Sequence, residues 1–137
     1  MEFKINNNKS KEEIIHEIDY EYNEVWDTIT VHDTLKHHIG IENNFLDIDC
    51  FDPKSFGEDY LKYVLTESHF IYKPKIDYVY TDAAYYLISR IVYKKSSMDL
   101  KDYLEEKLFK YLDIKEFDWK KCPKGYSMGA TGLLLST

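Results

Sequence analysis

Tyr80, Thr81 and Asp82 stand at the junction between an aromatic-rich stretch and an apolar one, within the segment YVYTDAAYYLISRIV. A phenol and a carboxylate two residues apart can exchange protons and hold a substrate, above all at the start of a helix, where backbone amides are free. Thr81 or Asp82 can also simply cap that helix by accepting hydrogen bonds from its first amides. The residues by themselves leave both interpretations open.

Other residue types that carry chemistry are not arranged into a site. Cys50 and Cys122 have no CxxC partner and no histidine at metal-ligand spacing, so we expect buried or partly buried thiols. His32 and His37 would point in different directions on a helix, and we expect them and His38 to be structural or on the surface. The sequence predicts no metal and no cofactor.

The composition is that of a globular protein rather than a disordered one. The chain has 137 residues, 44% of them hydrophobic, and contains 13 Tyr and 7 Phe. The formal net charge of -7 argues against binding to a phosphate backbone. The start lacks the apolar core of a signal peptide, and no run approaches the roughly 20 apolar residues of a membrane span. We therefore expect no nucleic-acid partner, no membrane span and, for the chain as given, a cytoplasmic location.

Capping signals and apolar spacing predict about five helices. Ser10 and Thr30 each open a capping box. Later helices are expected to open at Ser55, at Thr81 or Asp82, and at Asp99. The residues expected on the buried sides are Ile14, Ile15, Ile18 and Tyr22; Val31, Leu35 and His38; Phe56, Tyr60, Leu61, Val64 and Leu65; Ala84, Leu87, Ile88, Ile91 and Val92; and Leu100, Tyr103, Leu104, Leu108 and Leu112.

The remaining segments are predicted to be irregular. Gly40 is expected to end the second helix in a left-handed conformation. Residues 70–80 alternate enough for extended structure, but Pro74 excludes a central strand position. The glycine-rich C-terminal stretch reads as a loop that ends in an apolar piece. The fold class predicted is mainly α, in a single domain over residues 1–137.

Four segments, in order, resemble the serine hydrolases related to class C β-lactamases and DD-peptidases, the penicillin-binding-protein-like enzymes. They are ITVHDTLKHHIGI (29–41), YVYTDAAYYLISRIV (78–92), MDLKDYLEEKLFKYLDI (98–114) and CPKGYSMGATGLLLST (122–137). The segment 78–92 is similar to the family's Tyr-x-Asn motif and the helix that follows it. The resemblance covers roughly residues 10–137. It implies the helical region of the β-lactamase/transpeptidase-like fold, lacking most or all of the antiparallel sheet.

The resemblance also implies acyl transfer, in which the serine of a Ser-x-x-Lys motif attacks an amide or ester carbonyl. It gives Tyr80 the role of general base or proton relay, and Asp82 the role of orienting a lysine and the substrate. Asp82 stands where asparagine is commonest, and a carboxylate keeps the acceptor but loses the amide donor. A tyrosinate at neutral pH would need neighbouring cations to lower its pKa from about 10.

The chain departs from the family at the nucleophile, because none of its serines has a lysine three positions later. His38-Ile39-Gly40 matches the family's His-x-Gly motif literally, but it precedes Tyr80 and is interpreted as chance. We therefore expect an incomplete domain, inert alone, that missing segments or a complementing chain would complete with the sheet and the nucleophile. Two alternatives stay open: a non-catalytic interaction module, and an unrelated small helical protein. The sequence does not distinguish peptide, ester and β-lactam substrates.

Overall fold

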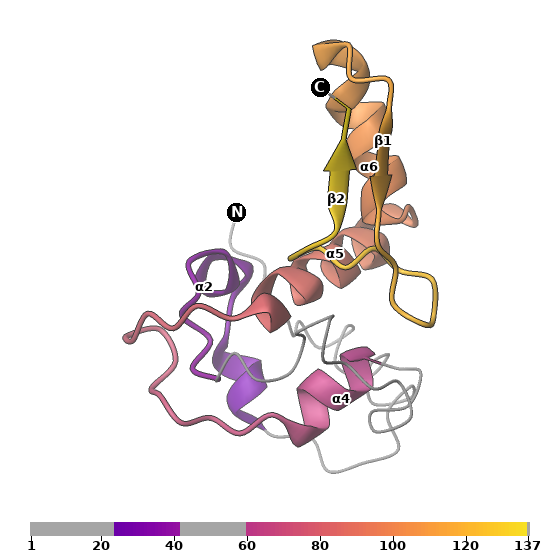
Figure 1. The fold of residues 1–137 in the computed structure, drawn as a ribbon. Helices are drawn as coiled ribbons and strands as arrows, with labels where there is room; N and C mark the ends of the chain where they lie inside the picture. The colour runs from indigo at the N-terminus through magenta and orange to yellow at the C-terminus, as the bar shows by residue number, and fades with distance from the viewer. Residues whose placement is uncertain (1–23, 42–59, 137) are drawn as a thin grey trace.

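The computed structural model describes residues 24–41 and 60–136. In chain order the elements are η1 (Glu24–Thr28), α2 (Val31–Leu35), α4 (Tyr60–Glu67), α5 (Asp82–Ser96), α6 (Leu100–Lys107), η2 (Phe109–Leu112), β1 (Phe117–Trp119) and β2 (Leu133–Leu135) (Figure 1). Strands β1 and β2 pair antiparallel and form the only sheet in this part of the chain. The described residues are mostly helical, which confirms the predicted mainly-α class.

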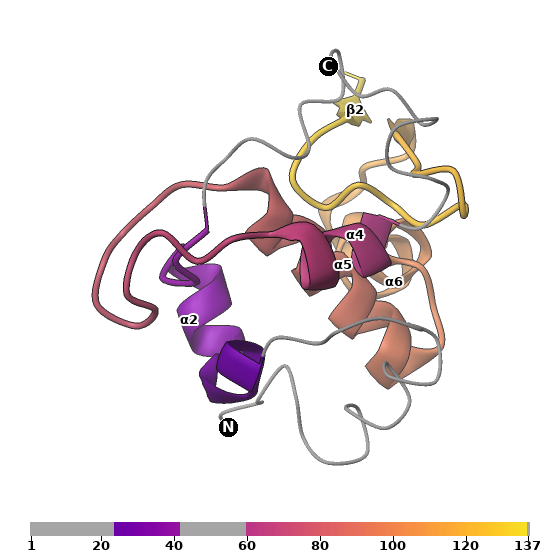
Figure 2. The same ribbon diagram turned by 90° about the horizontal axis from the view of Figure 1, so that it is seen from below.

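Helix α5 is the centre of the described fold. It contacts α2, α4 and α6. In Figure 1 the unit of α6 and the β1–β2 hairpin extends from α5 on the side away from α4. Seen from below, α4 lies across α5 (Figure 2). Thr81 begins the helix as its N-cap, with Oγ1 accepting from the amide of Ala83 at 3.3 Å, as the capping interpretation expected.

The main core lies between η1, α4, α5 and the segment around Cys122. The indole N–H of Trp26 donates to the carbonyl of Leu65 at 3.1 Å and so joins η1 to α4. The residues of this core are Trp26, Ile29, Ile39, Ile41, Tyr60, Leu61, Val64, Leu65, Ala83, Ala84, Tyr86, Leu87, Cys122 and Met128. The predicted apolar side of α4 is therefore confirmed over its described residues.

The buried face of α5 differs from the predicted stripe. Ala84 and Leu87 are buried as expected, whereas Ile88, Ile91 and Val92 are only half-buried. Tyr86 and Arg90 occupy the buried positions instead. Arg90 Nη1 donates to Tyr86 Oη at 3.2 Å, and the guanidinium lies 3.7 Å from the ring centre of Tyr126. These contacts allow polar groups to be buried, because a buried donor needs an acceptor.

Helix α6 is also shorter than its leucine pattern predicts. Leu100 is buried, but the α-helix ends at Lys107 and a 3-10 turn follows. Leu108 and Leu112 are consequently exposed, at 42% and 59%, while Phe109 turns inward and packs on Phe117 at 4.9 Å. The predicted stripe is wrong beyond the end of the helix, because its spacing assumed uninterrupted α geometry.

Helix α2 has the predicted start and an unexpected end. The amide of Asp33 donates to Thr30 Oγ1 and the amide of Thr30 donates to Asp33 Oδ2, so the capping box is confirmed. The helix ends at Leu35, which is 46% exposed, and not near Gly40. Gly40 does have a left-handed φ of 84°, but its role is close packing. A Cβ there would lie 2.5 Å from the carbonyl oxygen of Tyr72.

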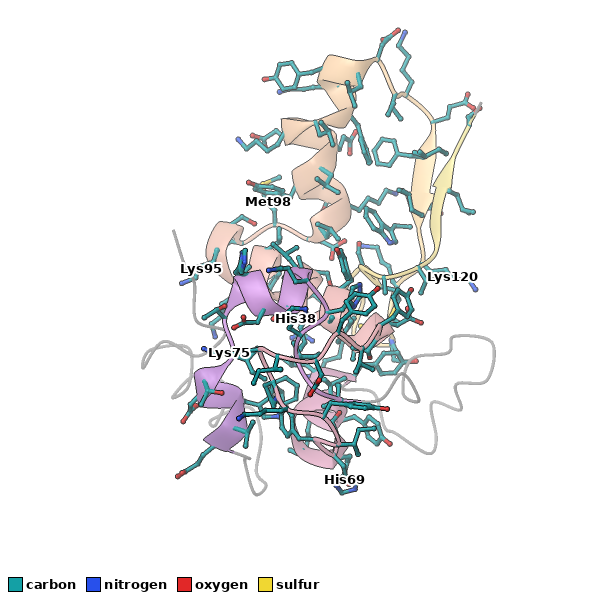
Figure 3. The ribbon with its side chains drawn as sticks, turned by 90° about the vertical axis from the view of Figure 1, so that its left-hand side faces the viewer. His38, His69, Lys75, Lys95, Met98 and Lys120 are labelled. Atoms are coloured by element: carbon teal, nitrogen blue, oxygen red, sulfur yellow. The ribbon has the colours of Figure 1, made fainter. Side chains whose placement is uncertain are left out.

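Residues 70–80 pass the end of α2 without forming a strand. Phe70 makes one isolated bridge with Ile41, and the amide of Lys75 donates to the carbonyl of His38 at 2.8 Å. Figure 3 shows Lys75 and His38 near the end of α2. The predicted irregular approach to α5 is confirmed. The helices expected at Ser10 and at residues 55–59, and Cys50, lie outside the described residues.

Candidate functional site

Tyr80 and Asp82 are brought together at the N-terminus of α5. The phenol of Tyr80 donates to Asp82 Oδ1 at 2.7 Å. Asp82 is the first residue of the helix, and Tyr80 is 51% exposed. A phenol and a carboxylate thus share a short hydrogen bond at a place that a substrate can reach.

The surroundings of Tyr80 favour its protonated form. The hydrogen bond to Asp82 raises the pKa of Tyr80, and partial burial and the charge of Asp82 act in the same direction. A phenol that donates to a carboxylate is stabilised with its proton on. At neutral pH Tyr80 is therefore a hydrogen-bond donor. A base role requires the opposite shift, which the groups acting on Tyr80 do not supply.

His37 is the third residue of this site, although from the sequence it was expected only to be structural or on the surface. Its ring centre lies 4.8 Å from that of Tyr80 and 5.0 Å from that of Tyr85. Its Nδ1 accepts from the amide of Thr81 at 3.3 Å. Burial lowers the pKa of His37, although the nearby carboxylate of Asp82 opposes this effect. His37 is therefore neutral at pH 7.

The backbone of His37 is unusual. The amide of His37 donates to the carbonyl of Thr34, and the amide of His38 donates to that of Asp33. These two bonds form a Schellman motif, in which His37, with φ 56°, takes the left-handed position that glycine usually fills. The helical projection used for His32 and His37 did not apply, because the helix ends before His37.

The other candidate thiol and histidine positions do not form a site. Cys122 is a buried free thiol, as expected, and accepts a hydrogen bond from Tyr86 Oη at 3.5 Å. Across residues 24–41 and 60–136, no three His, Cys, Asp or Glu side chains are grouped to hold a metal ion. None of the helices in those two stretches has the length and apolar character to cross a bilayer.

A second polar cluster surrounds Ser127. Ser127 Oγ donates to Asp99 Oδ2 at 2.5 Å, its amide donates to Asp99 Oδ1 at 2.8 Å, and Lys121 Nζ lies 3.2 Å from Asp99 Oδ2. Burial opposes ionisation of Asp99, but these hydrogen bonds hold its pKa below the usual value. Ser127 is fully buried, so no substrate reaches it. The cluster ties the C-terminal segment to the start of α6.

Comparison with known proteins identifies a family over most of the chain. A family model described as Beta-lactamase matches residues 18–133. A search among curated proteins returned no match. The matched range contains α2, Tyr80 with Asp82, α5, α6 and the Ser127 loop. It spans most of the 137 residues, which excludes an unrelated helical protein. The chain belongs to the beta-lactamase family.

Proposed function

We propose that this chain is the part of a β-lactamase-related serine hydrolase that handles protons through Tyr80 and Asp82. The observation that carries the proposal is the 2.7 Å hydrogen bond between Tyr80 Oη and Asp82 Oδ1 at the start of α5. The pair is accessible, and it stands at the position that resembles the Tyr-x-Asn motif. The reaction class is acyl transfer on an amide or ester.

Tyr80 and Asp82 take complementary roles in this reaction. The carboxylate of Asp82 attracts the ammonium of the Ser-x-x-Lys lysine, which belongs to a segment or chain outside these 137 residues. A cation at that point lowers the pKa of Tyr80 and offsets the effect of Asp82. This shift favours the tyrosinate, and in that form Tyr80 accepts the proton of the attacking serine and returns it to the leaving group.

The chain alone is proposed to be inert. None of its serines has a lysine three residues later, and Ser127 is buried against Asp99. Without a nucleophile the remaining proton-handling pair has no acyl group to act on. The substrate, whether peptide, ester or β-lactam, is set by the segments that complete the site.

Intact-mass measurement tests this proposal. The full chain is incubated with a reactive penicillin and, separately, with a fluorophosphonate, beside an intact enzyme of the family as a positive control. We expect no mass gain in this chain and a stoichiometric adduct in the control. An adduct that disappears when a single serine is replaced by alanine would show that the chain carries its own nucleophile.

A second candidate function is an interaction module that completes a partner chain. The observation that favours it is the row of exposed leucines on β2, Leu133, Leu134 and Leu135, of which Leu134 is 63% exposed. A partner that carries the remaining sheet would cover these leucines, which alternate between the two faces of the hairpin. Light scattering during size exclusion tests it. A protein that stays monomeric and gains no partner from its native lysate contradicts this function.

A further inference from the structure

We propose that the neutral imidazole of His37 positions the Tyr80–Asp82 pair, so that the protonation state of His37 controls the geometry of the site. His37 acts through the backbone on either side of Tyr80 and is a positioning residue. This inference rests on the proposed function only in taking Tyr80 and Asp82 as the site. The contacts of His37 are observed independently of any reaction.

Two hydrogen bonds hold the backbone around Tyr80 to His37. The amide of Val79 donates to the carbonyl of His37 at 3.0 Å, and the amide of Thr81 donates to its Nδ1 at 3.3 Å. The residues before and after Tyr80 are therefore both bound to one residue. Since Thr81 is also the N-cap of α5, the second bond fixes the peptide that joins Tyr80 to the helix carrying Asp82.

The ring of His37 is enclosed by tyrosines. Tyr80 and Tyr85 lie on it at tilted angles of 38° and 35°, and Tyr78 meets it edge-on at a centroid distance of 5.9 Å. Tyr85 is itself anchored, because its phenol donates to the carbonyl of Leu35 at 3.2 Å. The ring therefore orients the phenol of Tyr80 as well as its backbone.

The left-handed backbone of His37 belongs to the Schellman motif that ends α2. A non-glycine residue with φ 56° is strained, and it persists only where its surroundings determine it. A glycine would relieve the strain but would lose the ring and its Nδ1.

Protonation removes one of the two bonds. Nδ1 accepts from Thr81 only without its own proton, so the neutral ring carries its proton on Nε2. A charged imidazole would present an N–H to the amide of Thr81, and the two donors would repel each other. The backbone at Thr81 must then move, and the Tyr80–Asp82 hydrogen bond loses its fixed geometry.

The groups around His37 set where this change occurs. The ring contacts Tyr85 from α5 and Tyr78 and Tyr80 from the preceding loop, and the charge of Asp82 from α5 acts on it. The titratable neighbours of His37 along the chain are Lys36 and His38. Asp33 of α2 and Lys75 of the loop pair with each other at 3.9 Å. Burial disfavours the charged ring, whereas Asp82 favours it, and the balance places the pKa below the usual value. The site therefore has its fixed geometry at neutral pH and loses it in mild acid.

Nuclear magnetic resonance of the full chain tests this. The signals followed from pH 4.5 to pH 8 are those of the Thr81 amide, of the Tyr80 ring carbon that bears the hydroxyl, and of the His37 imidazole. We expect all three signals to shift with one common midpoint below the ordinary 6.5 of histidine. Constant Thr81 and Tyr80 signals during the titration of His37 would overturn the proposal.

Three variants separate positioning from general structural effects. In His37→Asn the amide oxygen stands where Nδ1 stood and asparagine tolerates a left-handed backbone, so we expect an intact Thr81 bond without the pH dependence. His69→Asn removes an exposed histidine that Figure 3 shows beyond α4, and it should leave the midpoint unchanged. Asp82→Asn should lower the midpoint without abolishing the transition, because its charge favours the protonated ring.

The titration can fail or succeed independently of the proposed function. The titration detects hydrogen bonding and no acyl transfer, so a penicillin adduct on some serine leaves it unaffected. If His37→Asn retains the full pH dependence of the Tyr80 signal, His37 is not its source and the inference is wrong. Should that variant fail to fold, the wild-type titration and Asp82→Asn still decide.

Discussion

Tyr80 and Asp82 show how a single hydrogen bond sets the protonation state of a residue. Asp82 Oδ1 accepts the phenolic proton at 2.7 Å, and Asp82 also lies at the start of α5, where the free amides of the helix favour negative charge. The hydrogen bond to this carboxylate raises the pKa of Tyr80 and keeps the phenol protonated at neutral pH. A base role for Tyr80 remains a prediction that depends on an additional cation.

The first prediction at this scale is that Asp82→Asn lowers the pKa of Tyr80. The amide can still accept the hydrogen bond but lacks the charge that stabilises the neutral phenol. Alkaline titration at 295 nm, with Tyr80→Phe subtracted, measures the pKa. Asp77→Asn is the matched control, because Asp77 accepts from the amide of Lys73 in the same loop. If the pKa of Tyr80 is unchanged in Asp82→Asn, the hydrogen bond between the two residues is not formed in solution.

The second prediction concerns Asp99, whose loss leaves two buried donors of Ser127 without their acceptor. We expect Asp99→Ala to lower the free energy of unfolding by about 1–3 kcal/mol. Asp118→Ala removes an exposed pair with Lys101 and a hydrogen bond from the amide of Trp119, and it should cost less than Asp99→Ala. Urea unfolding at pH 7 compares the two variants. Equal effects would contradict the structural role of the Ser127 cluster.

The pH dependence of this difference follows from the sign of the shift. The pKa of Asp99 is lowered in the folded state, so its contribution to stability is complete above the unfolded value of 3.8. It is lost as the pH falls through the folded value. The gap between wild type and Asp99→Ala should therefore be constant from pH 7 to pH 5 and narrow in stronger acid. If the difference in stability between wild type and Asp99→Ala widens in acid, the pKa of Asp99 is raised in the folded state and not lowered.

Helix boundaries decide which side chains the elements present. Helix α2 ends at Leu35 in a Schellman motif, and the ring of His37 is consequently directed toward Tyr80 and Tyr85. Helix α5 begins at the Thr81 cap, which separates Tyr80 from Asp82 by one residue across the helix start. The site is therefore built from the end of one helix and the start of another.

The prediction at this scale is that the Thr81 hydroxyl stabilises the start of α5. Thr81→Ala removes the cap to Ala83 and should cost about 0.5–2 kcal/mol, whereas Thr81→Ser keeps the hydroxyl and should cost less. Urea unfolding followed by circular dichroism measures both variants. If serine is as damaging as alanine, the buried methyl group and not the cap accounts for the effect.

At the scale of the whole molecule, the segment around residues 122–131 returns to α5 before β2 begins. Gly129 allows this approach, because a Cβ there would lie 2.1 Å from the carbonyl oxygen of Tyr85. Cys122 and Met128 enter the main core, while the β1–β2 hairpin extends beyond it (Figure 1). The segment joins the hairpin to the helices.

The prediction at this scale is that Gly129→Ala detaches the segment from α5. The new methyl group overlaps backbone atoms, so the whole segment must shift. Gly125→Ala is the control: its Cβ meets nothing within 4 Å, and only its φ of 87° costs about 1–2 kcal/mol. Limited trypsin digestion at Lys120, Lys121 and Lys124 should be faster in Gly129→Ala than in Gly125→Ala. Equal rates would contradict this packing.

The sequence alone determined the features that depend on neighbouring residues. The Thr30–Asp33 capping box, the Thr81 cap, the apolar side of α4, the mainly-α class and the resemblance to the family were all read from short segments, and the structure and the family match confirm them. The reason is physical: capping bonds and helical faces join residues within about four positions of each other.

The tertiary structure decided the rest. The hydrogen bond between His37 and Thr81 joins residues 44 positions apart, and no local sequence pattern predicts it. The burial of Tyr86 and Arg90, and the early ends of α2 and α6, follow from packing against distant elements. Packing also brings the ring of His37 against the tyrosines and sets its pKa. Charge and burial act through space, so only the folded chain fixes the chemistry of this site.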